Sequence, residues 1–397
     1  MEGFNFEIDT ECELMACSTA ESMWKRVTRV EGGPTVDHST PKSQGGVGHF
    51  VHFSTIIGMT GDKGIFKTRR MTPHRDFQCL EFFQYHSGHD TDQLNIWIRE
   101  FQSEYDTVGA SRLIGQITGS PAHYWRLQHL QLRTTKAFQM EFEAVKGQGV
   151  SGGGFSLDDI NLSETVCPHH VWHIRDFGGI LQSVSGKQWS NSPRFYSSEG
   201  YGFQIIGLFQ PGAFGVFFRL ASGANDDNLQ WPCLNRQITF QLLEQRSSIL
   251  QRMSKQLSWT LSTTQNFTRD GQTHCYWDNP RIVGRQYSDS EGVYHAGPFY
   301  GHSYFLSSDI IMEGDFIRAG DAFLLINFED VLNQISPILP TPMPESSVNL
   351  PSLIDNLSPC VYQELSTDCP TASAVCTSSQ SVSFLAVIAV ILLIHWG

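Results

Sequence analysis

The sequence predicts an all-β protein, and three observations carry this prediction. No long segment places apolar residues at helical spacing, short runs alternate apolar and polar residues, and Gly, Pro, Asn and Ser bound those runs. Val, Ile, Phe and Trp at a period of two indicate antiparallel strands, and many short strands indicate sandwiches or barrels. The clearest predicted strands are Gln93–Ile98, Ala137–Phe142, Gly202–Gly207, Gly215–Leu220 and Gln237–Leu242.

The 397-residue chain divides into four predicted segments. A Gly-rich, acidic stretch ends the first pattern of strands near Cys167-Pro168, and the second pattern ends after Asp330. From Ser336 to Ser383, Pro, Ser and Thr dominate and apolar periodicity is lost, which is typical of a disordered stalk. The predicted segments are therefore 1–167, 168–332, 333–383 and 384–397, with one or two helical turns expected in Leu243–Lys255.

The two chain ends give targeting signals. Residues 384–394 read FLAVIAVILLI and only HWG follows, whereas a membrane-spanning helix needs about 20 apolar residues. Small residues, a polar spacer and an apolar tail form the pattern of a GPI-anchor signal, with Ser373 as the candidate attachment residue. A short transmembrane anchor is the alternative. No signal peptide is visible at the N-terminus, so we expect an incomplete or alternative N-terminus.

Composition favours a secreted protein and argues against a nucleic-acid binder. Forty acidic against 27 basic residues give a net charge of −13, so phosphates would not be neutralised. Three N-glycosylation acceptors and nine cysteines indicate the secretory route. The acceptors are Asn161, Asn266 and Asn356, and the candidate disulfide cysteines are Cys12, Cys17, Cys79, Cys167, Cys233 and Cys275. An odd cysteine count leaves at least one thiol free or paired with another chain.

The first predicted domain carries the motifs of a known extracellular module. These are Phe6-Glu7, Cys12, Trp24, Gly48-His49-Phe50-Val51, Cys79-Leu80-Glu81-Phe82-Phe83, Gly88, Trp125, Phe155-Ser156-Leu157-Asp158-Asp159-Ile160 and Cys167. In order and spacing, residues 4–167 resemble a MAM domain, a jelly-roll-like sandwich found in meprins and receptor phosphatases.

The second predicted domain carries a second set of motifs. These are Val171-Trp172-His173-Ile174, Ser192 through Tyr201 (SPRFYSSEGY), Trp231-Pro232-Cys233, Trp277-Asp278-Asn279-Pro280 and Gly314-Asp315-Phe316-Ile317. Residues 168–330 thereby resemble a MATH (TRAF-type) domain, an eight-stranded antiparallel sandwich that serves as an interaction module. The resemblance implies two β-sandwich domains in tandem, in the order found in meprins.

The sequence departs from the meprin pattern at several places. Meprins place an astacin-type zinc protease before this pair, and no His-Glu pair occurs here from which its HExxH motif could be built. Phe4 stands where the MAM pattern usually has a cysteine, and Cys17 is additional. Whether Cys12 closes on Cys17 or one of them bridges to a second chain stays open. An epidermal-growth-factor-like module is not recognisable near Cys360, Cys369 and Cys376.

Catalytic and metal motifs are weak. Gly149 to Gly153 matches GxSxG but lies in a Gly-rich stretch with no helical pattern after it, so a loop is expected. The histidines of 169–173 and 86–90 are expected at the surface or at strand edges. For Asp158-Asp159, a structural turn or strand start is favoured over a cation site. We therefore predict no enzyme, no cofactor and no metal.

The predicted function is a non-catalytic cell-surface protein that mediates adhesion or homo-oligomerisation through its two domains. A non-catalytic regulatory or decoy partner of a meprin-type metalloprotease is the first alternative, and an intracellular TRAF-type adaptor is the second. The expected partners are the same chain or a meprin-like chain, with membrane attachment through the C-terminal tail.

Overall fold

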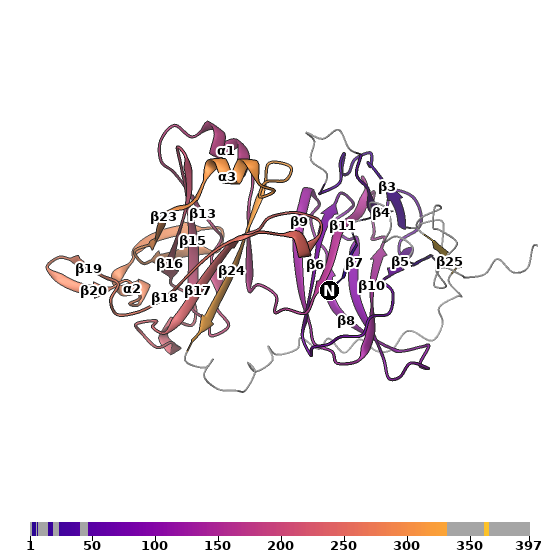
Figure 1. The fold of residues 1–397 in the computed structure, drawn as a ribbon, viewed down its shortest axis with the longest axis horizontal. Helices are drawn as coiled ribbons and strands as arrows, with labels where there is room; N and C mark the ends of the chain where they lie inside the picture. The colour runs from indigo at the N-terminus through magenta and orange to yellow at the C-terminus, as the bar shows by residue number, and fades with distance from the viewer. Residues whose placement is uncertain are drawn as a thin grey trace, which may run out of the picture.

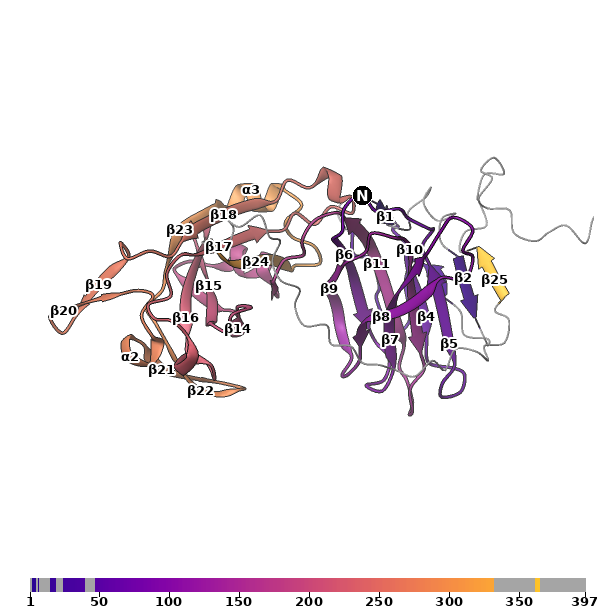
Figure 2. The same ribbon diagram turned by 90° about the horizontal axis from the view of Figure 1, so that it is seen from below.

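The computed structural model describes residues 2–4, 6, 15–18, 24–39, 47–331 and 361–364. Within these ranges, antiparallel sheets build two sandwiches that lie side by side (Figures 1 and 2). The prediction of an all-β chain with two antiparallel sandwiches in tandem is confirmed. No helix in these ranges has the length and apolar character that a membrane span requires. The predicted tail 384–397 and Ser373 lie outside the described residues.

The first sandwich consists of two six-stranded sheets. One sheet runs in the order β3 (Trp24–Val27), β4 (Phe50–Ser54), β11 (Gly154–Ser163), β6 (Gln78–His86) and β9 (Ala122–Leu132), with β1 (Glu2–Phe4) also paired to β11. The other runs β25 (Val361–Glu364), β2 (Met15–Ser18), β5 (Lys63–Lys67), β10 (Ala137–Val145), β7 (Gln93–Phe101) and β8 (Ala110–Ile117).

The second sandwich pairs a four-stranded sheet with a seven-stranded one. The smaller sheet runs β12 (His170–Ile174), β24 (Ala322–Asp330), β17 (Arg236–Leu242) and β18 (Lys255–Thr260). The larger runs β13 (Gln188–Asn191), β15 (Gly202–Gln210), β16 (Ala213–Ala221), β22 (Gly292–Ala296) and β21 (Arg285–Asp289), while β14 (Phe195–Tyr196) pairs with β15 and β23 (Tyr300–Ser307) with β16.

Short helices and one hairpin complete the second sandwich. The hairpin is formed by β19 (Asn266–Arg269) and β20 (Gln272–Cys275). The helices are α1 (Phe177–Ser183), α2 (Pro280–Val283), α3 (Ser308–Glu313) and the 3₁₀ turns η3 (Asp226–Asn228) and η4 (Ile249–Gln251). Of the predicted helical stretch 243–255, the structure therefore forms one 3₁₀ turn, η4, between β17 and β18.

All five strands singled out from the sequence are strands in the structure: they correspond to β7, β10, β15, β16 and β17. One difference falls in the predicted stalk. Residues Val361–Glu364 form β25, which pairs antiparallel with β2 at the edge of the first sandwich. An edge strand such as β2 offers unpaired backbone groups with which another strand can pair.

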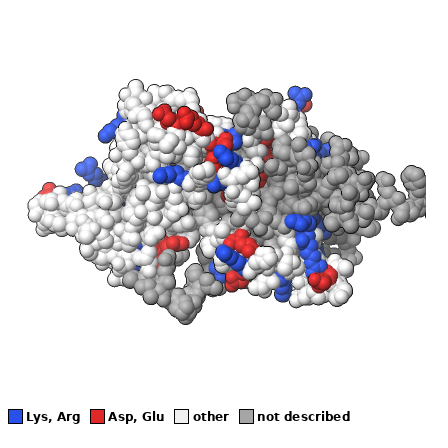
Figure 3. Space-filling view, in the orientation of Figure 1, with Lys and Arg blue, Asp and Glu red and all other residues white. Residues whose placement is uncertain are grey.

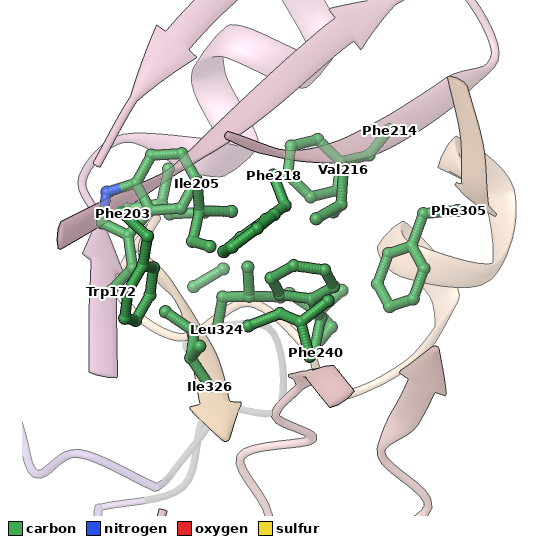
Figure 4. Packing of buried hydrophobic residues seen from close by; sticks show 14 of the residues in the cluster. Trp172, Phe203, Ile205, Phe214, Val216, Phe218, Phe240, Phe305, Leu324 and Ile326 are labelled. Carbon is green, nitrogen blue, oxygen red and sulfur yellow. The ribbon is translucent and has the colours of Figure 1, made fainter. Parts of the chain in front are cut away.

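Each sandwich has its own aromatic-rich core. In the first, Phe66 stacks on Phe142 with ring centroids 4.8 Å apart, and Phe82 meets Phe142 edge to face. In the second, Phe203 and Phe218 from the larger sheet face Phe240 and the β24 residues of the smaller one (Figure 4). Alternation along each strand directs these side chains inward, which is why the period-two pattern predicted the fold.

Candidate functional site

Both faces of β6 are buried, and this defines the junction between the two sandwiches. Leu80 and Phe82 point into the core of the first sandwich, whereas Phe83 and Tyr85 pack toward the second. A strand with one solvated face would show buried and exposed residues in turn, but β6 is buried along its whole length. The second sandwich therefore covers what would otherwise be the outer face of the first.

The junction has an apolar centre with contributions from both sandwiches. Its buried residues are Phe50, Phe83, Tyr85, Trp125 and Leu127 from the first and Leu243, Phe323 and Leu325 from the second. Phe83 contacts Phe323 edge to face across the junction, with ring centroids 5.6 Å apart. Burial of several large apolar side chains here fixes the two sandwiches relative to each other.

A buried polar cluster lies beside this apolar centre. In β11, Asp158 is inaccessible to solvent and Asp159 has a φ of 47° at a β-bulge, which turns both carboxyl groups toward His38. The backbone N–H of His38 donates to Asp158 Oδ2 at 2.8 Å, and His38 Nδ1 lies 2.8 Å from Asp159 Oδ2. Burial, and then repulsion from Asp159 and Asp37, raises the pKa of Asp158 well above its usual value.

The same histidine reaches the second sandwich. His38 Nε2 lies 3.2 Å from Gln245 Oε1, while Gln245 Nε2 donates to the carbonyl groups of Phe316 and Asp321. Because the Gln245 amide nitrogen is used as a donor, its oxygen accepts, and the hydrogen in this contact belongs to His38 Nε2. Gln245 is fully buried, so the contact is shielded from water. Asp158 and Asp159 therefore lie at a bulge inside β11, not at the turn or strand start expected from the sequence.

An ion pair joins the sandwiches on the other side of the apolar centre. The loop between β17 and β18 extends to β6 and β9, as Figure 1 shows, and brings Arg252 to Glu81. His129 Nε2 lies 2.9 Å from the second oxygen of the same carboxylate. Burial raises the pKa of Glu81, but the charges and hydrogen bonds of Arg252 and His129 outweigh burial and lower this pKa to about 2.

A cavity of about 240 Å³ opens at the junction between the sandwiches. Tyr85, Tyr124 and Trp125 from the first sandwich and Arg175, Arg318 and Phe323 from the second are among its lining residues. The Arg175 guanidinium lies 3.7 Å from the Tyr124 ring centroid, a cation–π geometry that holds the charge at the cavity wall. Positive charge and aromatic surface therefore occur together in one pocket.

A second exposed feature lies on the larger sheet of the second sandwich. Trp189 in β13, Phe217 in β16 and Phe299 just before β23 pack on each other with ring centroids 5.3 to 5.4 Å apart. We call this trio the aromatic face. Trp189 is 45% exposed and Phe299 is 44% exposed, although large aromatic side chains usually bury most of their surface.

Two cysteines from the sequence analysis form a disulfide. Cys79 at the start of β6 bonds to Cys167, which directly precedes the second sandwich, with Cα atoms 5.1 Å apart. The bond ties the connecting segment to the strand that forms the junction. Cys12 lies outside the described residues, and Cys17 lies in β2.

The disulfide expectation for Cys233 and Cys275 differs from the structure, in which both carry free thiols. Cys233 is fully buried in the core of the second sandwich, and burial raises the pKa of its thiol. The Sγ atom of Cys275 instead faces the carbonyl oxygen of Ser262. Each thiol is thus accommodated by local packing rather than by a bond to the other.

Asn161, one of the predicted glycosylation acceptors, lies at a buried position in the folded chain. Asn161 is 1% exposed in β11, and its Nδ2 donates to the carbonyl groups of Asp159 and of Ser247 in the second sandwich. A glycan there would displace the junction. Asn266 is exposed at the start of the β19–β20 hairpin, where a glycan has room. Asn356 lies outside the described residues.

The residues of the catalytic and metal motifs considered above make contacts within the fold. Ser151 is buried in the loop between β10 and β11, with its Oγ atom 2.6 Å from Thr55 Oγ1, and β11 rather than a helix follows. His170 stacks on Phe195, and His173 contacts Asp321. In the part of the chain that the structure describes, no group of three His, Cys, Asp or Glu is arranged to hold a metal ion.

Sequence reasoning missed the residues that build the junction. Arg252, Gln245 and Arg175 belong to no motif, and the motif that contains Glu81 gave no sign of an ion pair. Only the stretch 243–255 between two strands signalled that β17 and β18 are not joined by a tight turn. On the face shown in Figure 3, acidic and basic side chains are interspersed, so charge alone does not mark the site.

The fold is a tandem of two β-sandwich domains joined by a buried junction. The family model for the MAM domain, meprin/A5/mu, matches residues 4–168, and the model for the MATH domain matches residues 169–318. The chain therefore carries a MAM domain followed directly by a MATH domain, and this pair is meprin-like.

Individual curated proteins show how similar this chain is to its relatives. Human meprin A subunit beta is 41% identical over 333 residues, which is 83% of this chain and 47% of that protein. Rat meprin A subunit alpha is 31% identical over 345 residues, 85% of this chain and 45% of that protein. Human MAM domain-containing glycosylphosphatidylinositol anchor protein 1 is 26% identical over 167 residues, 42% of this chain and 16% of that protein.

This chain spans about half the length of the meprin subunits it matches. The match covers their MAM–MATH region, which is the non-protease part of those proteins.

Proposed function

We propose that this chain is a cell-surface interaction protein whose second sandwich binds an extended segment of a partner protein. The MAM and MATH domains and the meprin-like relatives support a protein-interaction role. The observation that carries the finer proposal is the aromatic face, because exposed clusters of large aromatic side chains are typical of binding surfaces.

The backbone beside the aromatic face suits such a partner. Strand β23 pairs with β16, and along its other edge no strand pairs with it among the described residues. An edge strand can take an additional strand from a partner through backbone hydrogen bonds, while neighbouring side chains supply specificity. Phe299 directly precedes β23, so an added strand would run beside the aromatic face.

The setting that we propose is the cell surface, with adhesion or homo-oligomerisation as the outcome. Meprin relatives and a MAM protein named for its glycosylphosphatidylinositol anchor support this setting, as does the GPI-type pattern around Ser373. Cys17 is the candidate for a disulfide between two copies. We propose no catalytic role for the domain pair, since Ser151 of the GxSxG match is buried within a loop.

Aggregation of protein-coated beads tests the proposal. Two colours of beads carrying the full chain should form mixed aggregates, and Trp189→Ala combined with Phe299→Ala should reduce mixing at least tenfold. Tyr105→Ala is the matched control, because Tyr105 is 92% exposed on the first sandwich and away from the aromatic face. Equal mixing by all three proteins would exclude the aromatic face as the adhesive surface.

A second candidate is a partner of a meprin-type metalloprotease, and the 41% identity to human meprin A subunit beta across the domain pair favours it. In this case the full chain should co-purify with an active metalloprotease from cells that make both, and the double aromatic variant should not. Release of the chain from intact cells by a phosphatidylinositol-specific phospholipase would support the surface location. Retention inside the cell without glycans would favour the cytosolic adaptor.

A further inference from the structure

We infer that the cavity at the junction binds a carboxylate group carried by a peptide segment. This inference rests on the proposed function, since the segment would belong to a protein partner, but it concerns a different surface from the aromatic face. The cavity of about 240 Å³ has room for one amino-acid side chain or chain end. Its lining includes two guanidinium groups, Arg175 and Arg318, and one carboxylate, Asp321.

The single carboxylate in the lining is already fully engaged. Asp321 Oδ1 accepts from the backbone N–H of Asp176 at 2.9 Å. Asp321 Oδ2 lies 2.8 Å from both His173 Nε2 and Arg175 Nε. These contacts fix Asp321 and orient Arg175, and they leave this carboxylate with little capacity for further donors.

The two guanidinium groups remain available to a ligand. Arg175 uses Nε toward Asp321, and its side chain is 52% exposed, so its guanidinium is accessible to a ligand. Arg318 uses one Nη group, which donates to Asp315 Oδ1 at 2.8 Å, and its buried Nε has no hydrogen-bond partner among the described residues. The Arg318 side chain is only 10% exposed, so solvent does little to compensate.

The chemistry of these donors selects the ligand. A guanidinium presents N–H groups in a planar fork that matches a carboxylate, and charge-assisted hydrogen bonds of this type are stronger than neutral ones. Both guanidinium groups are already held in place, Arg175 by Asp321 and Tyr124 and Arg318 by Asp315. Little side-chain entropy is therefore lost on binding. The aromatic rings of Tyr85 and Tyr124 supply apolar walls for the methylene groups beside the carboxylate.

Isothermal titration calorimetry on the full chain tests the inference with three acetylated tetrapeptides. The first is Gly-Phe-Glu-Gly with an amidated end, the second replaces Glu by Gln, and the third is Gly-Phe-Gly-Gly with a free C-terminal carboxylate. We expect at least one carboxylate peptide to bind at least tenfold more tightly than the Gln peptide. The first and third peptides separate the two sources of the carboxylate, an acidic side chain or a chain end.

Variants assign the binding to the cavity. Arg318→Met and Arg175→Met should each weaken binding at least tenfold, and Arg318→Lys, which keeps the charge but loses the fork, at least fivefold. Arg285→Met, at an exposed position in β21, should bind as the parent does. Circular dichroism and thermal melting check that each variant folds. If inorganic phosphate displaces the peptide equally well, the site is a general anion site and carboxylate selectivity is overturned.

The inference is overturned if neither carboxylate peptide binds more tightly than the Gln peptide, or if no peptide binds. Unchanged binding by both Arg318→Lys and Arg175→Met would also overturn it. None of these outcomes bears on the aromatic face, because bead aggregation reports on Trp189 and Phe299 separately. Loss of aggregation in the aromatic variant together with normal peptide binding would conversely leave the cavity assignment intact.

Discussion

Replacing Glu81 by Gln tests how strongly the ion pair joins the two sandwiches. The change keeps the shape of the side chain but removes the charge that faces Arg252, whose side chain is 5% exposed. A buried charge that loses its partner costs about 3–5 kcal/mol. The pKa of Glu81 supports this magnitude, because lowering it from 4.5 to about 2 corresponds to about 3 kcal/mol.

The direction of the pH dependence follows from the same pKa. Since the pKa of Glu81 is lower in the folded chain than in the unfolded chain, its contribution is complete above about pH 4.5. As the pH falls from about 4.5 toward 2, the unfolded chain binds the proton first and this contribution is lost. The Glu81→Gln variant cannot titrate here, so its stability should fall less steeply over this range.

Urea unfolding between pH 2 and pH 8 measures both effects, with tryptophan fluorescence as the readout because Trp125 lies in the junction. Arg252→Met and the double variant complete a double-mutant cycle, in which the double variant should lose less than the sum of the single losses. Arg285→Met is the control, because Arg285 lies at an exposed position in β21 and its loss should change stability little. If Glu81→Gln behaves like this control and keeps the pH profile of the parent, the ion pair does not stabilise the junction.

Three further predictions concern the same junction. Cys79→Ser should destabilise the chain by about 2–5 kcal/mol in urea unfolding, because the bond to Cys167 closes a loop across 88 residues. In reductant the parent also lacks this bond, so a difference between parent and variant that persists there would contradict the explanation. In animal cells, Asn266→Gln should remove one glycan and Asn161→Gln none, as read from mass before and after glycosidase treatment; a glycan on Asn161 would contradict the buried position. Phe83→Ala should lower the free energy of unfolding by about 3–5 kcal/mol in the same assay. A loss below about 1 kcal/mol would mean that neighbouring side chains fill the space left by the ring.

Local patterns were sufficient to predict the strands and the class of fold. QLNIWI and AFQMEF alternate apolar and polar residues, and this period of two is a property of the strand itself that needs no partner to be recognised. The GxSxG match was also interpreted correctly as a loop, since the surrounding glycines favour a turn over a helix. Boundaries were less certain, as β25 within the predicted stalk shows: it forms because β2 offers an unpaired edge.

The candidate sites depended on contacts that no local pattern contains. Asn161 fits the glycosylation triplet in the sequence, but the second sandwich buries it through Ser247, 86 residues away. Cys233 is one of an odd set of cysteines, and only its depth in an aromatic core shows why it remains a thiol. In both cases the deciding quantity is burial by another part of the chain.

By itself, the sequence determined an all-β chain of two sandwiches with the motifs of MAM and MATH domains, because strand periodicity and motif spacing are local properties. Only the tertiary structure decided what lies between the sandwiches. The pairing of Glu81 with Arg252, the contact of His38 with Gln245 and the gathering of Arg175 and Arg318 around one cavity all join distant segments. Such contacts arise because both faces of β6 must be buried, and the second sandwich supplies the surface that buries one of them.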